Sequence, residues 1–588
     1  MLFGKNWFAR RPLFLGALVA AAHLGCSAPA PPEGPRSLLA EKAEGGRSQI
    51  DAIVIGDESR EALLATQSWT VLFPRRSILT FGVGVHFDGT GDAPGWGRVV
   101  VAIDGREVAK ETVNPRVAHD WKDVTVEIDA PPRRGVLSIS IRFTDKDGVD
   151  IPQPPGLRLA VSDPILHDRA AYGRRRGVIL ISVDTLRRDH VGAYGYAKPT
   201  TPTLDALARE GVLAEDAVSV SSWTLPSHLS MMTSVLPGAH GGTDMGEGFN
   251  RSVPTVAELL KAEGVATHAV TSHLYVSKTY GLDVGFDSMN FRQDRLAANV
   301  ANHAMDLIDR FGDRPFFLFL HFYDPHWHYA PPPEVLKIFE SSYAGKLTGN
   351  LKDFHNLRPD QVSAADLDHL LALYDGEIRY TDDEIGRLVT HLKERGVAGN
   401  TLMLVTSDHG EEFLEHGSWE HQKTLYEEVI RVPLMVSGPG VSPRREAQPV
   451  SLLDVAPTIL DFFSIQPAPS MKGLSLLRPA PDHREMYGET DHTLDGSRLS
   501  FLRNGAGSWK AILRTDPLRQ TVRSSEWFDL AKDPAERTNR PPPEALRVSI
   551  EARIRDEALK SRSQVARRPV ELSPEQKEKL RALGYIGR

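Results

Sequence analysis

Residues 177–183 read GVILISV, and this apolar run ends directly at Asp184. An uninterrupted apolar run of this length is typical of a parallel strand that is buried on both faces. Four similar runs follow along the chain, at residues 265–271, 316–321, 402–406 and 432–436. Helical patterns separate these runs, and strands that alternate with helices indicate a sheet covered on both faces. The sequence therefore predicts an α/β fold with a mostly parallel sheet between helices.

The helical patterns between the runs are amphipathic. One begins near Thr201, a second covers residues 256–262, and the longest covers residues 366–393. The longest places an apolar side chain every three or four residues along a single stripe, as a helix that packs on a sheet does. We therefore expect three helices in these segments.

Different patterns precede and follow this region. From about Trp69 to Ile165 the apolar residues alternate with a period of two, and Asp104-Gly105 is a hairpin signal, so this part predicts an antiparallel β-sandwich. This part contains Trp69, Trp96 and Trp121. Their rings either form a platform on which sugars stack or, as we favour, pack inside and on the surface of a structural domain. The expected domains are a β-sandwich accessory domain at 49–170, a catalytic domain at 177–480 and a small α+β subdomain at 481–588.

The N-terminus has the pattern of an export signal. Basic residues precede an apolar run at 13–24, which is too short for the roughly 20 residues that span a membrane. Cys26 follows directly and resembles the lipidated cysteine of bacterial lipoproteins, although an ordinary cleaved signal stays open. Residues 27–48 have the composition of a flexible linker. We expect an exported protein of the cell envelope that contacts the membrane only through an N-terminal lipid anchor.

Composition excludes several classes of protein. The chain has 588 residues and a formal net charge of −8, whereas a nucleic-acid binder normally has a basic excess. Cys26 is its only cysteine, so the chain forms no internal disulfide and no zinc site built from several thiolates.

Polar clusters stand at the ends of three predicted strands. Asp184 follows the first run, Asp324-Pro325-His326 the third and Asp408-His409 the fourth. Sites in open α/β sheets form beyond the carboxyl ends of the strands. Carboxylates and an imidazole that converge there suit a divalent cation.

The motifs of this region resemble one family. The segments VILISVDTLRRDHVGAYGY, TLPSHLSMMTSVLPGAHG, LHFYDPHWHYAPPP, VTSDHGEEF and WFDLAKDPAERTN are similar to those of sulfatase-type hydrolases of the alkaline phosphatase superfamily. The resemblance covers roughly 400 residues from Gly177 onward, more than a single domain of average length. It implies attack by a metal-bound nucleophile on the sulfur or phosphorus of an ester.

The resemblance also implies roles for individual residues. Asp184, Asp408 and His409 match metal ligands, and Thr224 falls at the position of the nucleophile, which also binds the metal. His326 matches a histidine that contacts the anionic oxygens of the substrate. His421 lies near a lysine with a similar role or a role in leaving-group departure, and His228 replaces the arginine of the nucleophile motif.

Two departures from the family change the expected chemistry. Sulfatases form formylglycine from cysteine, or in some members serine, at the position where this chain has Thr224, and Ser222 and Ser227 are out of register. Thr185 replaces a second metal-binding aspartate. We therefore expect a threonine nucleophile activated by a divalent metal, a covalent intermediate, and direct attack of water on sulfur or phosphorus.

A ligand set of two carboxylates, one imidazole and one hydroxyl favours zinc or manganese over calcium. Calcium is the third candidate for the metal. The spacing of Asp324 and His328, with His492 as a third ligand, leaves a second metal site open. The expected substrate is an anionic ester, either sulfate or phosphate, with a sulfated or phosphorylated glycan or lipid as candidate. A phosphoethanolamine-type transferase and a catalytically inactive sugar-binding protein of the same fold are the alternatives.

Overall fold

The computed structural model describes most of the chain beyond the N-terminal signal. The described residues are 36–38, 50–55, 58–73, 76–87, 95–115, 121–129, 132–168, 176–312, 314–340, 342–350, 353, 358–491, 493, 495–505, 508–516, 519, 521–560 and 567–582. The predicted signal with Cys26 lies outside them, as does His492, so the export and lipid-anchor predictions stay predictions. None of the described helices combines the length and the apolarity needed to cross a membrane.

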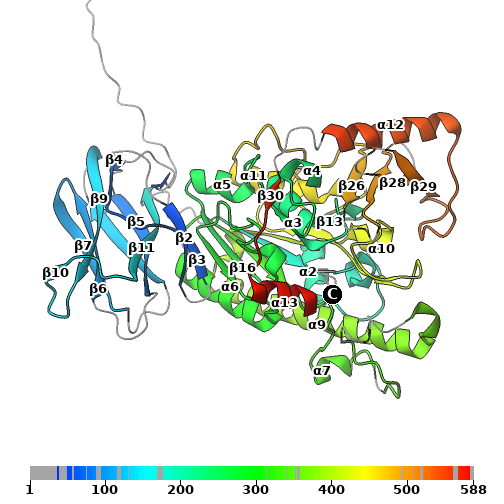
Figure 1. Cartoon of the computed structure of the whole chain (residues 1–588), viewed down its shortest axis with the longest axis horizontal. Helices are drawn as coiled ribbons and strands as arrows, with labels where there is room; N and C mark the ends of the chain where they lie inside the picture. The colour runs from blue at the N-terminus through cyan, green and yellow to red at the C-terminus, as the bar shows by residue number, and fades with distance from the viewer. Residues whose placement is uncertain are drawn as a thin grey trace, which may run out of the picture. The chain divides into compact units, whose positions relative to one another are not determined.

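The apolar run at residues 177–183 forms the central strand β12 (Gly177–Val183). Its two neighbours, β18 (Phe316–Phe322) and β19 (Thr401–Thr406), are both parallel to it. Beyond β18 lie β16 (Ala266–Thr271) and β17 (Ser288–Phe291), also parallel. This part of the sheet confirms the predicted parallel α/β fold (Figure 1).

The last predicted run forms β23 (Leu434–Ser437), which is antiparallel to β19. A parallel connection needs a crossover, usually a helix that packs on a face of the sheet. Between β19 and β23 the helical segment is only α10 (Glu427–Ile430), which is a single turn. The strands β13 (Val212–Ala214) and β24 (Arg444–Glu446) continue the sheet beyond β23, with β24 at the edge.

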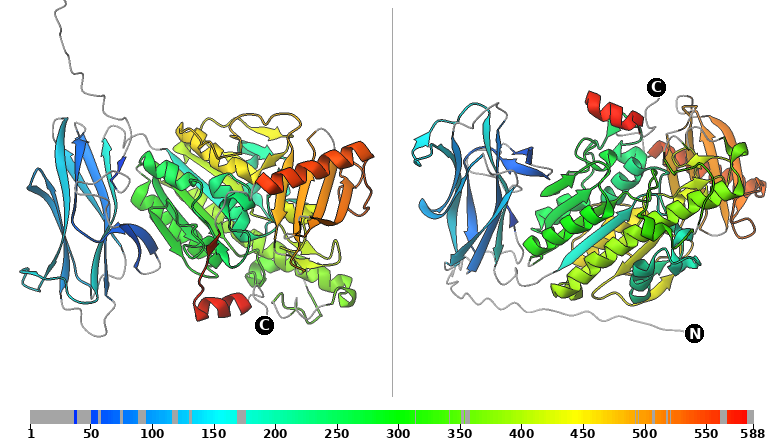
Figure 2. Two further views of the ribbon diagram at one scale, coloured as in Figure 1. Left: turned by 45° about the horizontal axis from the view of Figure 1, so that its top comes forward. Right: turned by 90° about the horizontal axis from the view of Figure 1, so that it is seen from below.

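Helices cover both faces of this sheet, as Figure 2 shows. Ile179, Ile181 and Val183 of β12 pack with α2 (Pro202–Glu210), α6 (Ala297–Phe311) and α9 (Ala364–Glu394). Val178 and Leu180 face the opposite side, with α3 (Thr224–Thr233), α5 (Val256–Ala262) and α11 (Val455–Phe463). Alternate residues of one strand point to opposite faces, which explains why β12 is apolar throughout.

Shorter elements connect these parts. They are η1 (Arg188–His190), η2 (Gly192–Tyr194), β14 (Ala217–Val218), α4 (Pro237–His240), η3 (Leu274–Val276), α7 (Pro333–Leu336), η4 (Pro359–Gln361), η5 (Ala398–Asn400), β20 (Glu412–Phe413), β21 (Trp419–Glu420), β22 (Arg431–Val432), β25 (Val450–Ser451) and η6 (Leu452–Asp454).

The N-terminal region is a two-layered β structure, as its alternating pattern predicts. One layer contains β4 (Gln67–Phe73), β6 (Trp96–Ile103), β7 (Arg106–Val113), β9 (Arg133–Thr144) and β10 (Asp150–Ile151). The other contains β1 (Arg36–Ser37), β2 (Ile50–Ile55), β3 (Glu58–Leu63), β5 (Arg76–Phe87), β8 (Lys122–Asp129) and β11 (Leu157–Asp168). Trp69 and Trp121 are buried, and Trp121 Nε1 donates to the Glu58 carbonyl, so neither ring belongs to an exposed platform.

The second layer and the α/β sheet are one continuous sheet. Strand β3 pairs with β17 in antiparallel register, with Ser288 opposite Arg60, and the joined sheet has fourteen strands. The domain boundary that we predicted between residues 170 and 177 therefore does not separate two sheets. Strands from both sides of it belong to the same sheet.

Polar contacts reinforce this junction. The Arg60 side chain is fully buried and binds Glu58 (Nε to Oε1, 2.9 Å) and Asp123 (Nη1 to Oδ1, 2.7 Å). The other oxygen of Asp123 accepts from Arg310 Nη1 of α6 at 2.8 Å. Asp123 thus links a buried arginine of the β-sandwich to a helix of the α/β part.

Asp123→Ala should lower the free energy of unfolding by about 2–4 kcal/mol, because it leaves a buried guanidinium with one carboxylate fewer. Asp150→Ala is the matched control, since Asp150 pairs with Arg142 and Arg98 at the surface, and it should cost at most about 1 kcal/mol. Urea denaturation of both variants measures the difference. Equal costs would show that the Asp123 contacts do not support the junction.

The C-terminal region forms an antiparallel sheet of β26 (Met486–Thr490), β27 (Arg498–Arg503), β28 (Trp509–Thr515) and β29 (Val522–Asp529), followed by α12 (Glu544–Lys560). Buried Lys510 joins this sheet to α10, because its Nζ lies 3.0 Å from Glu427 Oε1 and 2.8 Å from Glu536 Oε1. The chain then returns through β30 (Arg568–Pro569), which pairs with β15 (Glu247–Gly248), to α13 (Pro574–Ala582).

Candidate active site

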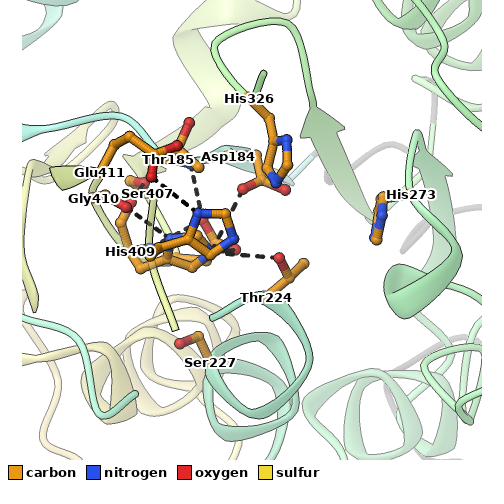
Figure 3. Close-up of polar contacts among 12 residues, drawn as sticks. Asp184, Thr185, Thr224, Ser227, His273, His326, Ser407, His409, Gly410 and Glu411 are labelled. Atoms are coloured by element: carbon orange, nitrogen blue, oxygen red, sulfur yellow. Dashed lines mark hydrogen bonds and ion pairs between the residues drawn. The ribbon is translucent and has the colours of Figure 1, made fainter. Parts of the chain in front are cut away.

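The site lies at the carboxyl ends of the three central parallel strands. Asp184 follows β12 directly, and Asp408 and His409 follow β19 by two and three residues. Thr224 is the first residue of α3, so its hydroxyl stands at a helix N-terminus. Figure 3 shows Asp184 and Thr224 beside the His409 imidazole. The structure thus brings together all four predicted metal ligands.

The ligand atoms are close together. One atom each from Asp184, Asp408 and His409 lies within 4.8 Å of the others. His409 Nε2 is 3.6 Å from Asp184 Oδ1, 3.3 Å from Asp408 Oδ2 and 3.4 Å from Thr224 Oγ1. All four residues are buried.

Hydrogen bonds occupy one oxygen of each aspartate. His321 Nε2 lies 3.2 Å from Asp184 Oδ2, and the Thr185 N–H donates to Asp408 Oδ1 at 3.4 Å. Asp184 Oδ1 and Asp408 Oδ2, the oxygens that face His409, are buried and have no hydrogen-bond partner in the described part of the chain. A buried carboxylate oxygen without a donor is costly unless a cation or a proton occupies it.

The state of His409 agrees with a role as ligand. Its Nδ1 lies 2.9 Å from the Gly410 carbonyl, which can only accept, so Nδ1 carries the hydrogen and Nε2 presents a lone pair. A second-shell hydrogen bond of this kind fixes the tautomer of metal-binding histidines. Two carboxylate oxygens, one imidazole nitrogen and one hydroxyl therefore fit a divalent cation.

Burial dominates the electrostatics of the site. It raises the pKa of Asp184 to about 7, opposed by the nearby His409. It also raises the pKa of Asp408, which the charge of Asp184 raises further. Both carboxylates are therefore harder to ionise without a cation than exposed aspartates.

The three predicted catalytic histidines occupy different places. His228 lies beneath the nucleophile, with Nδ1 2.8 Å from the Thr224 carbonyl and Nε2 3.0 Å from Ser182 Oγ. The His421 ring lies 4.3 Å from that of His409, and the His326 ring lies 5.0 Å from that of His421. His326 and His421 therefore border the ligand group, whereas His228 supports the helix that carries Thr224.

Three buried residues near the site were missed by the sequence-based prediction. His321 binds Asp184, and the His273 ring stacks on Tyr323 at 5.1 Å. Glu411 is 2% exposed, and its Oε1 lies 3.2 Å from His421 Nδ1. His273 lies to one side of the ligand group in Figure 3. Because it follows the end of β16 by two residues, the strand-end rule applied to a fourth strand would have found it.

The second metal site has no support among the described residues. Asp324 Oδ1 accepts from the Ala297 N–H at 3.0 Å, so this carboxylate caps the N-terminus of α6. His328 is exposed, and among the described residues neither it nor Asp324 belongs to a group of three side chains that could hold a metal ion. With His492 outside the described residues, the second site stays a prediction.

Comparisons with known proteins match the part of the chain that contains this site. The sulfatase family model matches residues 176–465. The chain is 25% identical over 440 residues to an arylsulfatase of Clostridium perfringens, covering 62% of this chain and 89% of the relative. It is 31% identical over 310 residues to the N-sulphoglucosamine sulphohydrolase of Homo sapiens, covering 47% of this chain and 59% of the relative. Among solved structures, the phosphonate monoester hydrolase of Agrobacterium radiobacter superposes with a TM-score of 0.54 at 19% identity, covering 68% of this chain and 99% of that one.

The fold, the site and these matches define a hydrolase of ester bonds with an alkaline-phosphatase-like α/β fold. Within that class, the chain is similar to the sulfatase family model and to the arylsulfatase and sulphohydrolase named above.

Proposed function

We propose that the protein hydrolyses sulfate esters, or phosphorus esters of the same charge, with Thr224 as the nucleophile. The observation that carries the proposal is the position of Thr224 Oγ1, 3.4 Å from His409 Nε2 at the ligand group. Thr224 stands where the sulfatase resemblance places a cysteine. Its hydroxyl needs activation, because an alcohol is a weak nucleophile at neutral pH.

Asp184, Asp408, His409 and Thr224 would hold the divalent cation. Such an ion lowers the pKa of a hydroxyl and offsets negative charge on sulfuryl or phosphoryl oxygens. The N-terminus of α3 adds a smaller favourable term, because helix N-termini attract anions.

In the first step, Thr224 Oγ1 forms a bond to the sulfur and the bond from sulfur to the ester oxygen breaks. The Thr224 proton ends on the departing alcohol, and a sulfothreonine remains. In the second step, water attacks the sulfur, the bond from sulfur to Oγ1 breaks, and Thr224 regains a proton as sulfate leaves. A formylglycine hydrate would expel sulfate by collapsing to an aldehyde, a route that threonine lacks.

His326 and His273 suit different roles in these steps. His326 Nδ1 lies 2.9 Å from the Trp327 carbonyl, so Nδ1 carries the hydrogen and Nε2 is an acceptor for a proton of the attacking water. His273 Nδ1 instead accepts from the Tyr275 N–H, so its Nε2 carries a hydrogen and can donate to an anionic oxygen. The oxygen-binding role that the family resemblance suggested for His326 therefore fits His273 better.

The charges around the site favour a singly charged ester. The two cations that act on Glu411, Lys423 and Arg187, are already paired. Lys423 binds Glu420 at 2.7 Å, and Arg187 binds Asp189 and Glu415. One divalent cation offsets only the two aspartates, so a singly charged ester leaves one negative charge uncompensated and a doubly charged phosphate monoester leaves two. At about 6 Å and an effective dielectric constant of 20, one extra unit charge costs about 3 kcal/mol against a carboxylate.

The two alternatives have less support. An inactive sugar-binding protein predicts a damaged site, whereas the four candidate ligands converge. A transferase to membrane lipids would need a second substrate as acceptor, whereas the relatives named above are an arylsulfatase and a sulphohydrolase. The name of the human relative makes a sulfated amino sugar our first candidate for the natural substrate.

A panel of three chromogenic esters tests the proposal: 4-nitrophenyl sulfate, bis(4-nitrophenyl) phosphate and 4-nitrophenyl phosphate, each with Mn²⁺, Zn²⁺ or Ca²⁺. The kcat/KM for the better singly charged ester should exceed that for the doubly charged phosphate by about a hundredfold, as the charge argument requires. Equal rates would contradict the charge argument. Absence of all three activities would contradict hydrolysis of such esters.

A further inference from the structure

Thr185, the residue after the first candidate ligand, connects three segments of the chain. Its hydroxyl donates to the Pro325 carbonyl at 2.9 Å, and its N–H donates to Asp408 Oδ1 at 3.4 Å. Its carbonyl accepts from the Tyr374 hydroxyl of α9 at 2.6 Å. The residue is fully buried, so these bonds are shielded from water.

The backbone of Thr185 is in an unfavourable conformation. Its φ is 55°, in the left-handed region that β-branched residues rarely adopt. Such a conformation costs roughly 1–3 kcal/mol and persists only where the surroundings hold it. The bonds to Pro325, Asp408 and Tyr374 supply this support.

Each of these bonds affects a different part of the site. The bond to Asp408 reaches Oδ1, which also accepts the His409 N–H at 3.0 Å, and together these bonds leave Oδ2 as the oxygen that faces His409 Nε2. The bond to Pro325 holds the residue directly before His326, at the start of the loop that leaves β18. The hydroxyl is committed to this carbonyl, so it is not directed at the ligand group.

We propose that Thr185 is a positioning residue whose hydroxyl sets the place of His326 relative to the cation ligands. The inference rests on the proposed function, because His326 matters only if a substrate is turned over beside it. It also assigns a role to the position where the family resemblance has a second metal-binding aspartate: in this chain the side chain links two loops.

The test compares Thr185→Val, which removes the hydroxyl but keeps the branched shape, with Thr185→Ser, which keeps the hydroxyl. In Thr185→Val, kcat for the best ester should fall by about 10–100-fold, with KM and the Mn²⁺ dissociation constant each within about threefold of the parent. Thr185→Ser should stay within about threefold of the parent in all three quantities. Tyr374→Phe removes a different bond of Thr185 and should lower kcat in the same direction.

Hydrogen–deuterium exchange on the metal-loaded proteins adds a measurement that does not depend on activity. Peptides covering residues 323–330 should exchange faster in Thr185→Val than in the parent or Thr185→Ser. Unchanged exchange there would overturn the inference, even if the parent hydrolyses none of the esters and the proposed function fails. A Mn²⁺ affinity that falls tenfold or more in Thr185→Val would overturn it too, because the hydroxyl would then be a ligand.

Discussion

Thr224→Ala is expected to lower kcat/KM by about 10³-fold or more, because it removes the atom that bonds to sulfur or phosphorus. Alanine can still occupy the first position of helix α3. The contact of His228 is with the backbone carbonyl at position 224, so it does not depend on the side chain that is removed. The fold should therefore survive. Steady-state kinetics with the best ester of the panel, together with a thermal melt, measure both quantities.

Two variants control this prediction. Thr224→Ser keeps a hydroxyl at the same place and should retain activity within about tenfold of the parent. Ser227→Ala removes a nearby buried hydroxyl that contacts the Ser221 carbonyl and Ser219 Oγ, and it should stay active. Mass spectrometry of acid-quenched enzyme should find one sulfuryl or phosphoryl group on the peptide that contains Thr224. Full activity of Thr224→Ala would exclude threonine as the nucleophile.

Asp408→Asn is expected to weaken divalent-cation binding by at least about a hundredfold and to lower kcat/KM by a comparable or larger factor. The amide keeps the shape of the side chain but removes one of the two negative charges that face His409 Nε2. Metal content after dialysis and titration calorimetry with Mn²⁺ or Zn²⁺ measure the affinity.

Asp324→Asn is the matched control, because its carboxylate accepts the Ala297 N–H and lies outside the ligand group. This variant should bind one cation as the parent does. Loss of bound metal from Asp324→Asn would instead establish the second site that the Asp324 and His328 spacing suggested. Unchanged metal binding in Asp408→Asn would contradict the assigned ligand set.

The sequence allowed a close prediction of the α/β part because its signals are local. In β12, buried on both faces, every residue must be apolar or small, and helix α9 shows its buried stripe at every turn. The strand-end rule then located Asp184, Asp408 and His409, since the carboxyl ends of neighbouring parallel strands meet at one edge. The prediction of these three residues did not require the order of the strands in the sheet.

Other features depended on pairing between distant segments. The antiparallel direction of β23 follows from a connection without a crossover helix, and the pairing of β3 with β17 joins segments more than 200 positions apart. The apolar pattern of a strand does not indicate which strand it pairs with, or whether the pairing is parallel or antiparallel. The burial of Glu411 was missed for a similar reason, because a charged pair in the sequence gives no sign of the His421 ring that faces it.

The amino-acid sequence by itself determined the secondary structure around β12 and the residue types of the site, including a threonine at the nucleophile position. These properties follow from side-chain periodicity and from covalent neighbours, which a linear chain displays directly. Only the tertiary structure decided which oxygen of each aspartate faces His409, which nitrogens of His273 and His326 carry hydrogen, and that Thr185 binds Pro325 and not the ligand group. Those properties arise from hydrogen bonds between residues that are far apart in the chain, and the directions of such bonds exist only once the segments have packed.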